Sequence, residues 1–174
     1  MRTEDFLRQV TALPGLSGNE GEVARFIAEA FRPYCDEVTI DPLNSVIGHI
    51  RGNGPKVMLC AHLDEIGLMV SDIEKDGSLR MRSVGGVDPR ILPGMRVTVY
   101  GRERLMGVIG AKAPHLLSAA DREKNYARED LYVDLGMSAQ RVRELVQIGD
   151  CIALEGGFTK LLNDRYASKT IDDR

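Results

Sequence analysis

His62 and Asp64 are the residues whose types and spacing best fit a metal site in this sequence. They follow the apolar run 56–61, which predicts a central strand covered on both faces. Side chains two positions apart on a strand share a face, and open α/β sheets place their sites at the carboxyl ends of strands. A histidine that binds a metal through one ring nitrogen needs an acceptor for the other, and Asp64 is placed to supply it. The alternative is the polar end of an ordinary strand, because His-x-Asp pairs are common.

Other candidate residues are less specific. Asp172 and Asp173 are adjacent carboxylates, a pattern that usually marks a solvated turn or a helix N-cap. His115 follows Pro114 in an expected loop, where a surface or packing histidine is the ordinary interpretation. Cys60 lies in the apolar run before His62 and is predicted to be a core thiol.

The composition of the chain excludes several classes of protein. The chain has 174 residues, of which 43% are hydrophobic, and its net charge of −3 excludes a strongly basic nucleic-acid binder. No apolar run approaches the roughly 18 residues of a membrane span, and the N-terminus lacks the apolar stretch of a secretory signal. Cys35, Cys60 and Cys151 are far apart, which indicates reduced thiols. We therefore expect a cytoplasmic protein with no nucleic-acid or membrane partner.

Two helices and three strands are expected before the candidate site. Apolar residues in 6–13 recur at helical spacing, with Thr3 as the expected N-cap. Ser17 and Glu20 form the capping-box pattern S-x-x-E, which predicts a second helix that ends at Pro33. Short strands are then expected at 38–41, 45–51 and 56–61.

Residues 67–154 predict a small β-barrel or sandwich, because short strands recur there at about ten-residue spacing. A helix is expected from Ser138 to about Ile148, and a long loop over 113–128. The strands are expected at 68–73, 79–84, 96–100, 105–109, 131–133 and 151–154. The expected core includes Met69, Ile73, Leu79, Met81, Val97, Val99, Val108, Val133 and Ile152.

The chain is thus expected to contain two parts, residues 1–66 with 159–174, and an insert at 67–158. The first part has too few elements to cover both faces of an apolar central strand. We therefore expect it to be a fragment or to need a partner.

Several motifs, in order, resemble one family over residues 13–174. The sequence is similar to the tetrahedral dinuclear-metal aminopeptidases, the glutamyl-aminopeptidase relatives often labelled endoglucanase, over their N-terminal half. The motifs are Pro14–Gly18, Ala61–Gly67, Gly107–Gly110 leading into Lys112–His115, Asp134–Gly136 and Ile171–Arg174.

The resemblance implies an α/β fold: an α/β/α metallopeptidase lobe, incomplete here, with an inserted small β-barrel dimerisation domain. It implies two divalent metal ions, zinc or cobalt, and hydrolysis of N-terminal residues from peptide substrates. By position in the motifs, His62 matches a metal ligand and Asp172 matches a metal ligand that bridges the two ions. Asp64 matches the residue of the catalytic group that orients His62.

The resemblance also implies residues that this sequence does not contain. In the family, a Glu-Glu pair, a further Asp and a final His follow the Asp-Asp-Arg motif, and the pair supplies the general base and a ligand. Zinc takes three or four protein ligands, so the chain is expected to be a truncated, inactive part of the enzyme. Family members form dimers that assemble further, so a homo-oligomer is expected. The apolar residues expected at the surface are Leu92, Pro93, Leu116 and Leu117.

Two alternatives stay open at the level of sequence. One is a non-catalytic β-barrel association module with a partial peptidase lobe. The other is a related metal-dependent deacylase or glycosidase, although no pair of carboxylates is placed as glycoside hydrolysis requires.

Overall fold

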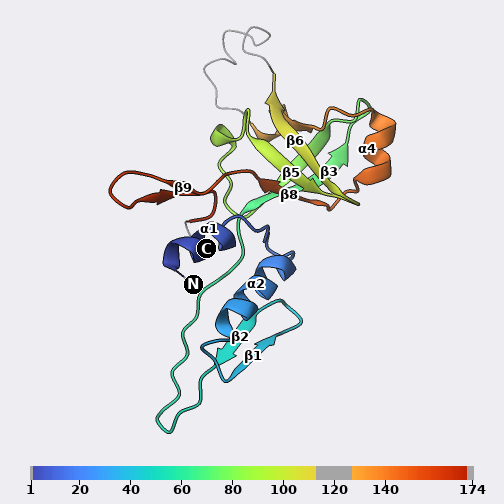
Figure 1. Ribbon diagram of the computed structural model, residues 1–174. Helices are drawn as coiled ribbons and strands as arrows, with labels where there is room; N and C mark the ends of the chain where they lie inside the picture. The colour runs from blue at the N-terminus through green and yellow to red at the C-terminus, as the bar shows by residue number, and fades with distance from the viewer. Residues whose placement is uncertain (1, 113–126, 172–174) are drawn as a thin grey trace. The chain divides into compact units, whose positions relative to one another are not determined.

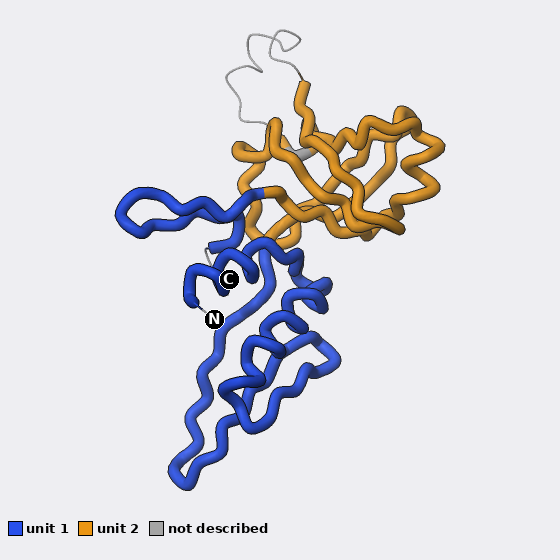
Figure 2. Tube along the Cα trace, in the orientation of Figure 1, with its two compact units in different colours: residues 1–65, 156–174 blue, residues 66–155 orange. Residues whose placement is uncertain are grey.

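The computed structural model describes residues 2–112 and 127–171. Pro114, His115, Leu116, Leu117, Asp172 and Asp173, and most of the loop expected over 113–128, therefore lie outside the described residues. The chain separates into two compact units, residues 1–65 with 156–174, here called the lobe, and residues 66–155, here called the barrel (Figure 2). Among the described residues, no helix is both long and apolar enough to cross a membrane.

Among the described residues, six antiparallel strands close into the barrel in the order β3-β4-β7-β6-β5-β8, with β8 pairing back onto β3. Figure 1 labels β3, β5, β6 and β8 in this unit. Closure leaves every strand with two neighbours and removes exposed sheet edges. The predicted α/β fold with a barrel between its segments is therefore confirmed. The strands are β3 Gly67–Ile73, β4 Leu79–Val84, β5 Arg96–Tyr100, β6 Arg104–Ala111, β7 Leu131–Asp134 and β8 Cys151–Leu154.

A contiguous apolar core fills the barrel, because alternate strand residues point inward. Ile73 packs against this core, as predicted. The predicted core residues that are buried are Leu79, Met81, Val97, Val99, Val133 and Ile152.

Three expectations for the barrel were wrong. On β6, Leu105 and Ile109 point inward, so Val108 faces outward and is 46% exposed. On β3, the same alternation buries Leu68 on the inner face and leaves Met69 only half-buried. Leu92, expected at the surface, is fully buried.

Short helices connect the barrel strands. The Ser138 Oγ accepts a hydrogen bond from the Arg141 N–H at 3.4 Å, so Ser138 is the N-cap, as predicted. This helix ends at Leu145, before the predicted end at Ile148. The helical elements here are the 3-10 helices η1 Pro89–Ile91 and η3 Arg128–Asp130, and the α-helix α4 Ala139–Leu145.

The described residues of the lobe form two helices and two separate two-stranded ribbons. Helix α2 packs on the β1–β2 ribbon, and at Gly48 an added Cβ would lie 2.9 Å from the ring of Phe31. The rings of Phe6 and Phe26 stack at 5.7 Å and join the two helices. The elements are α1 Thr3–Val10, α2 Gly21–Phe31, β1 Glu37–Ile40, β2 Val46–His49, β9 Thr159–Lys160 and β10 Tyr166–Ala167.

Both predicted helix caps in the lobe were wrong. Arg2 is the N-cap of α1, with no side-chain capping bond, and Thr3 is the first helical residue. Glu20 is the N-cap of α2, so Ser17 stands outside the helix. The hydroxyl of Ser17 has a different partner, described below.

The predicted central strand at 56–61 was also wrong. Residues 51–64 have no regular secondary structure, and Val57, Met58 and Leu59 are 82%, 84% and 93% exposed. Cys60, expected in the core, is exposed as well. A strand needs a neighbour for its backbone groups, and within the described part of the chain no strand pairs with this segment. The apolar side chains of Val57, Met58 and Leu59 are therefore not packed against other described residues in this structure.

Candidate metal centre

His62 and Asp64 are brought together as predicted, although they extend from an irregular segment. The Nδ1 atom of His62 lies 3.0 Å from Oδ1 of Asp64, and the two side chains are 51% and 36% exposed. When Nδ1 holds the ring proton and donates it to Asp64, the lone pair of Nε2 is oriented as a metal ligand needs. Since an ionised carboxylate only accepts hydrogen bonds, this contact fits the tautomer of His62 that carries its proton on Nδ1.

Ser17 is a site residue that the sequence reasoning missed. Its hydroxyl donates a short hydrogen bond to Oδ2 of Asp64, so both carboxylate oxygens have a partner. The Ser17 bond, with a further contribution from His62, lowers the pKa of Asp64 against the opposing effect of burial. Asp64 is therefore ionised at neutral pH. The only sequence signal was the position of Ser17 inside the Pro14–Gly18 motif.

Glu65 anchors the end of the same segment. Its N–H donates to the carbonyl of Gly15 at 2.8 Å, and the Gly15 N–H donates to Oε1 of Glu65 at 3.0 Å. Leu16 and Glu65 also form an isolated parallel bridge. Residues 15–17 therefore hold 64–65 through backbone and side-chain bonds, across about fifty positions of sequence.

Lys169 joins a distant part of the chain to this anchor. Its ammonium donates to Oε1 and Oε2 of Glu65 at 2.9 and 2.6 Å. The side chains of Glu65 and Lys169 are only 3% and 11% exposed, so the ion pair is buried. Because its carboxylate is occupied by this pair, Glu65 is unsuited to serve as a metal ligand although it adjoins Asp64.

The residues present fit one side of a metal centre. They provide one imidazole oriented by a carboxylate, a donor that suits divalent transition metals. Asp172, the second expected ligand, lies outside the described residues. No group of three or more His, Cys, Asp or Glu side chains suited to a metal ion occurs within residues 2–112 and 127–171.

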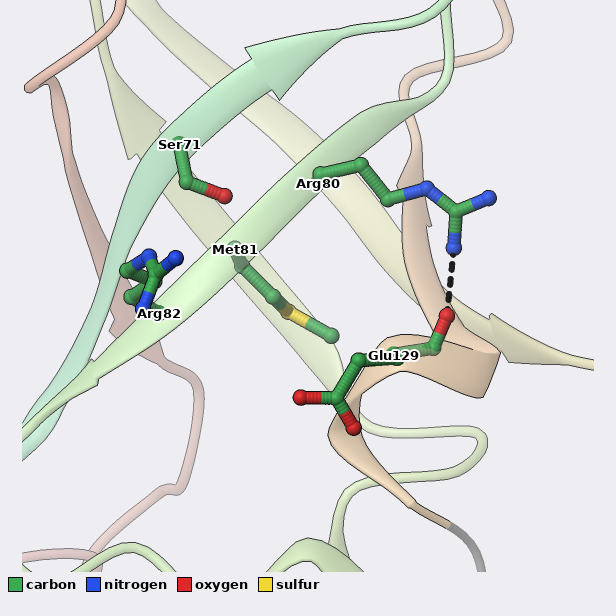
Figure 3. Close-up of a pocket in the computed structure, with 5 residues that line it drawn as sticks. All are labelled: Ser71, Arg80, Met81, Arg82 and Glu129. Atoms are coloured by element: carbon green, nitrogen blue, oxygen red, sulfur yellow. Dashed lines mark hydrogen bonds between the residues drawn. The ribbon is translucent and has the colours of Figure 1, made fainter.

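A small pocket on the barrel is not a competing site. Figure 3 shows Arg80 reaching across it to the backbone carbonyl of Glu129, with Nη1 donating at 2.7 Å. The Nε of Arg80 also donates to Glu74 at 2.7 Å. The guanidinium is therefore used to brace β4 against η3. The other lining residues are Ser71, Met81 and Arg82.

Comparison with known proteins points to one family. Residues 44–174 match the M42 glutamyl aminopeptidase family model. The lysyl aminopeptidase of Pyrococcus furiosus is 35% identical over 175 residues, which cover 98% of this chain and 51% of the relative. The chain thus spans about half the length of the curated relatives it matches.

Solved structures agree with the sequence match. An aminopeptidase from the archaeon Desulfurococcus kamchatkensis has a TM-score of 0.89 and 34% identity, over 97% of this chain and 47% of that one. The TET1 peptidase of Pyrococcus horikoshii has a TM-score of 0.86 and 32% identity, over 98% of this chain and 52% of that one. The latter assembles into a tetrahedron or a large octahedral shell.

Proposed function

Because the chain belongs to the M42 glutamyl aminopeptidase family, we propose that it forms the His62 side of a metal-dependent aminopeptidase that removes N-terminal residues from peptides. The observation that supports this most directly is the hydrogen-bonded series Ser17–Asp64–His62 in the lobe. Such a series orients an imidazole toward a metal and keeps the orienting carboxylate ionised.

Each residue has a proposed role. His62 binds a metal ion through Nε2, Asp64 orients the ring, and Ser17 holds Asp64. Asp172 would hold metal through its carboxylate. The family is metal-dependent, and we propose two ions, zinc or cobalt. When bound, they polarise the scissile carbonyl and activate water for attack.

One imidazole and one carboxylate are fewer than the three or four protein ligands of a zinc site. We propose that the remaining ligands and the general base lie in the half of the relatives that this chain does not match. The 174 residues alone are then expected to bind metal weakly and to leave aminoacyl-anilides intact.

The barrel is the proposed dimerisation domain, and the assembly is proposed to be a homo-oligomer of dimers, as in the tetrahedral and octahedral TET1 peptidase. Since Leu92 is buried, the apolar residues available at the barrel surface are others. Ile91, Met106 and Val108 are 58%, 57% and 46% exposed. Light scattering that finds only monomer at high protein concentration would contradict self-association.

We also propose a cytoplasmic location, since the three cysteines are free thiols.

The catalytic proposal is tested with a chimera in which this chain replaces the matched part of the Pyrococcus furiosus relative. We expect the chimera to release N-terminal residues from peptides in a metal-dependent manner. His62→Ala is expected to abolish both metal binding and turnover, and Asp64→Ala to weaken metal affinity about 10–100-fold. His49→Ala is the matched control, because His49 is another exposed histidine of the lobe. Equal losses at His49 and His62, or rapid hydrolysis by the 174 residues alone, would contradict the proposal.

The association-module function is the second candidate, and the self-contained barrel core favours it. It predicts a folded, self-associating chimera that binds no metal at His62.

A further inference from the structure

We propose that the ion pair between Glu65 and Lys169 is the positioning element of the metal centre. In this role it holds the segment that leads to Asp172 against the segment that contains His62 and Asp64. The inference rests on the proposed function, because the ligand roles of His62 and Asp172 belong to it.

The location of the pair fits this role. Glu65 stands three residues after His62, and Lys169 stands three residues before Asp172. The pair therefore joins the two ligand-bearing segments, although its members are 104 positions apart in sequence. Both carboxylate oxygens of Glu65 accept hydrogen bonds from the ammonium of Lys169. The Oε1 atom also accepts a hydrogen bond from the N–H of Gly15. One carboxylate thus gathers three segments of the lobe.

Burial distinguishes this pair from the surface pairs of the same unit. Lys160 and Glu4 also form an ion pair, at 3.3 Å, but the lysine side chain is 46% exposed. An exposed pair exchanges readily with water and restrains the chain little. The side chains of Glu65 and Lys169 are only 3% and 11% exposed, so separating them would leave a largely buried charge without its partner, which is unfavourable. Glu65 and Lys169 therefore restrict their two segments to one relative position.

The backbone around Lys169 is held closely on a second side. A Cβ added at Gly156 would lie 2.8 Å from Cβ and 3.4 Å from Cα of Lys169, so only glycine permits this approach. The hydroxyls of Ser168 and Thr170 are buried and have no hydrogen-bond partner among the described residues. Buried hydroxyls are nearly always paired. The hydroxyls of Ser168 and Thr170 can therefore still form hydrogen bonds, close in sequence to Asp172.

The test uses the 174-residue chain labelled with ¹⁵N, with Co²⁺ as a paramagnetic probe that reports weak binding. Amide signals of 62–64 and of 171–173 are followed during a Co²⁺ titration. In the wild-type chain we expect both sets to be perturbed together, with one midpoint, because the proposed ligands of the ion, His62 and Asp172, belong to these two segments. A change in fold stability alone would not separate the two sets.

Lys169→Met is expected to make the amides of 62–64 and those of 171–173 respond differently to Co²⁺. The 171–173 amides should no longer respond together with the 62–64 amides, and the Co²⁺ midpoint should rise about 10–100-fold. The double variant Glu65→Gln/Lys169→Met leaves no unpaired buried charge and keeps an acceptor for the Gly15 N–H. It is expected to fold even if Lys169→Met does not, and to show the same separation.

Two matched controls test specificity. Lys160→Met removes the exposed pair in the same unit and is expected to leave the Co²⁺ response unchanged. Gly156→Ala is expected to raise the midpoint by crowding Lys169, whereas Gly157→Ala is not, because nothing lies within 4 Å of an added Cβ there.

The outcomes separate the two proposals. If the double variant keeps joint perturbation of both segments at the wild-type midpoint, the positioning role is overturned and the metal centre stands. If His62→Ala leaves the Co²⁺ response unchanged, the metal centre itself is wrong, and the positioning role falls with it. Separation of the two sets in both Lys169 variants, with His62→Ala abolishing the response, would support both.

Discussion

The barrel and the lobe differ in how far they bury their apolar side chains. In the barrel, closure gives each strand two neighbours and encloses a core that includes the fully buried Leu68, Val99 and Ile152. In the lobe, the strands occur as two-stranded ribbons, and the apolar residues Val57 and Leu59 are exposed. The barrel therefore encloses its apolar residues through closure of the sheet, whereas the described strands of the lobe form no closed sheet.

The candidate site lies in the region with the weaker core. Its geometry is set by polar contacts across long stretches of sequence, from Ser17 to Asp64 and from Glu65 to Lys169. Buried charge pairs and shared carboxylates fix directions, which an apolar core does less specifically. The barrel is thus held by a continuous apolar core, whereas the candidate site in the lobe is held by a small number of polar contacts.

The largest expected effect contrasts one leucine from each region. Leu68→Ala, at a fully buried barrel position, should lower the free energy of unfolding by about 2–5 kcal/mol. Leu59→Ala, at a 93% exposed lobe position, should change it by less than about 0.5 kcal/mol. Urea unfolding followed by circular dichroism measures both. Equal effects would mean that segment 57–59 is buried in solution and would remove the contrast.

A glycine pair tests the close packing of the barrel. A Cβ added at Gly101 would lie 2.3 Å from the carbonyl oxygen of Leu145, a backbone atom that cannot rotate away. We expect Gly101→Ala to cost about 1–3 kcal/mol in urea unfolding, through displacement of α4. At Gly86 nothing lies within 4 Å of an added Cβ, so Gly86→Ala serves as the control. A barrel that tolerates both changes equally would be more loosely packed than its closure suggests.

The smallest expected effect concerns surface charge, where the two regions should be alike. Hydrogen bonds from Arg90 lower the pKa of Asp88 in the barrel from 3.8 to about 2. A bond from Lys160 likewise lowers the pKa of Glu4 in the lobe. Because the folded-state pKa of Asp88 is depressed, its contribution to stability is present above about pH 4 and is lost as the pH falls toward 2.

Arg90→Ala should therefore raise the pKa of Asp88 toward 3.8, measured by the ¹³C shift of its carboxyl during an acid titration. Asp76 is the internal control, since its pKa is lowered chiefly by hydrogen bonds from Ser78. A shift of Asp76 as large as that of Asp88 would show a general change in the barrel and not the loss of one pair.

Much of the barrel could be predicted from sequence because its strands are specified by local pattern. Alternating apolar residues and glycine-containing turns located all six strands within a few residues. The face of each strand was harder to predict: Val108 and Met69 are apolar, and only the register of the sheet decided which neighbours point inward. In the site, His62 and Asp64 were found because they are two positions apart.

Local sequence patterns were enough to locate the barrel strands and α4 to within a few residues, to pair His62 with Asp64, and to identify the family. The folded chain was needed to show that Ser17 holds Asp64 instead of capping α2, that Lys169 pairs with Glu65, and that Val57–Leu59 have no neighbouring strand among the described residues. The difference arises from the sequence separation of the interacting residues. Turns, caps and two-residue alternation depend on neighbouring residues, whereas hydroxyl–carboxylate bonds, buried ion pairs and strand pairing depend on which distant segments the folded chain brings together.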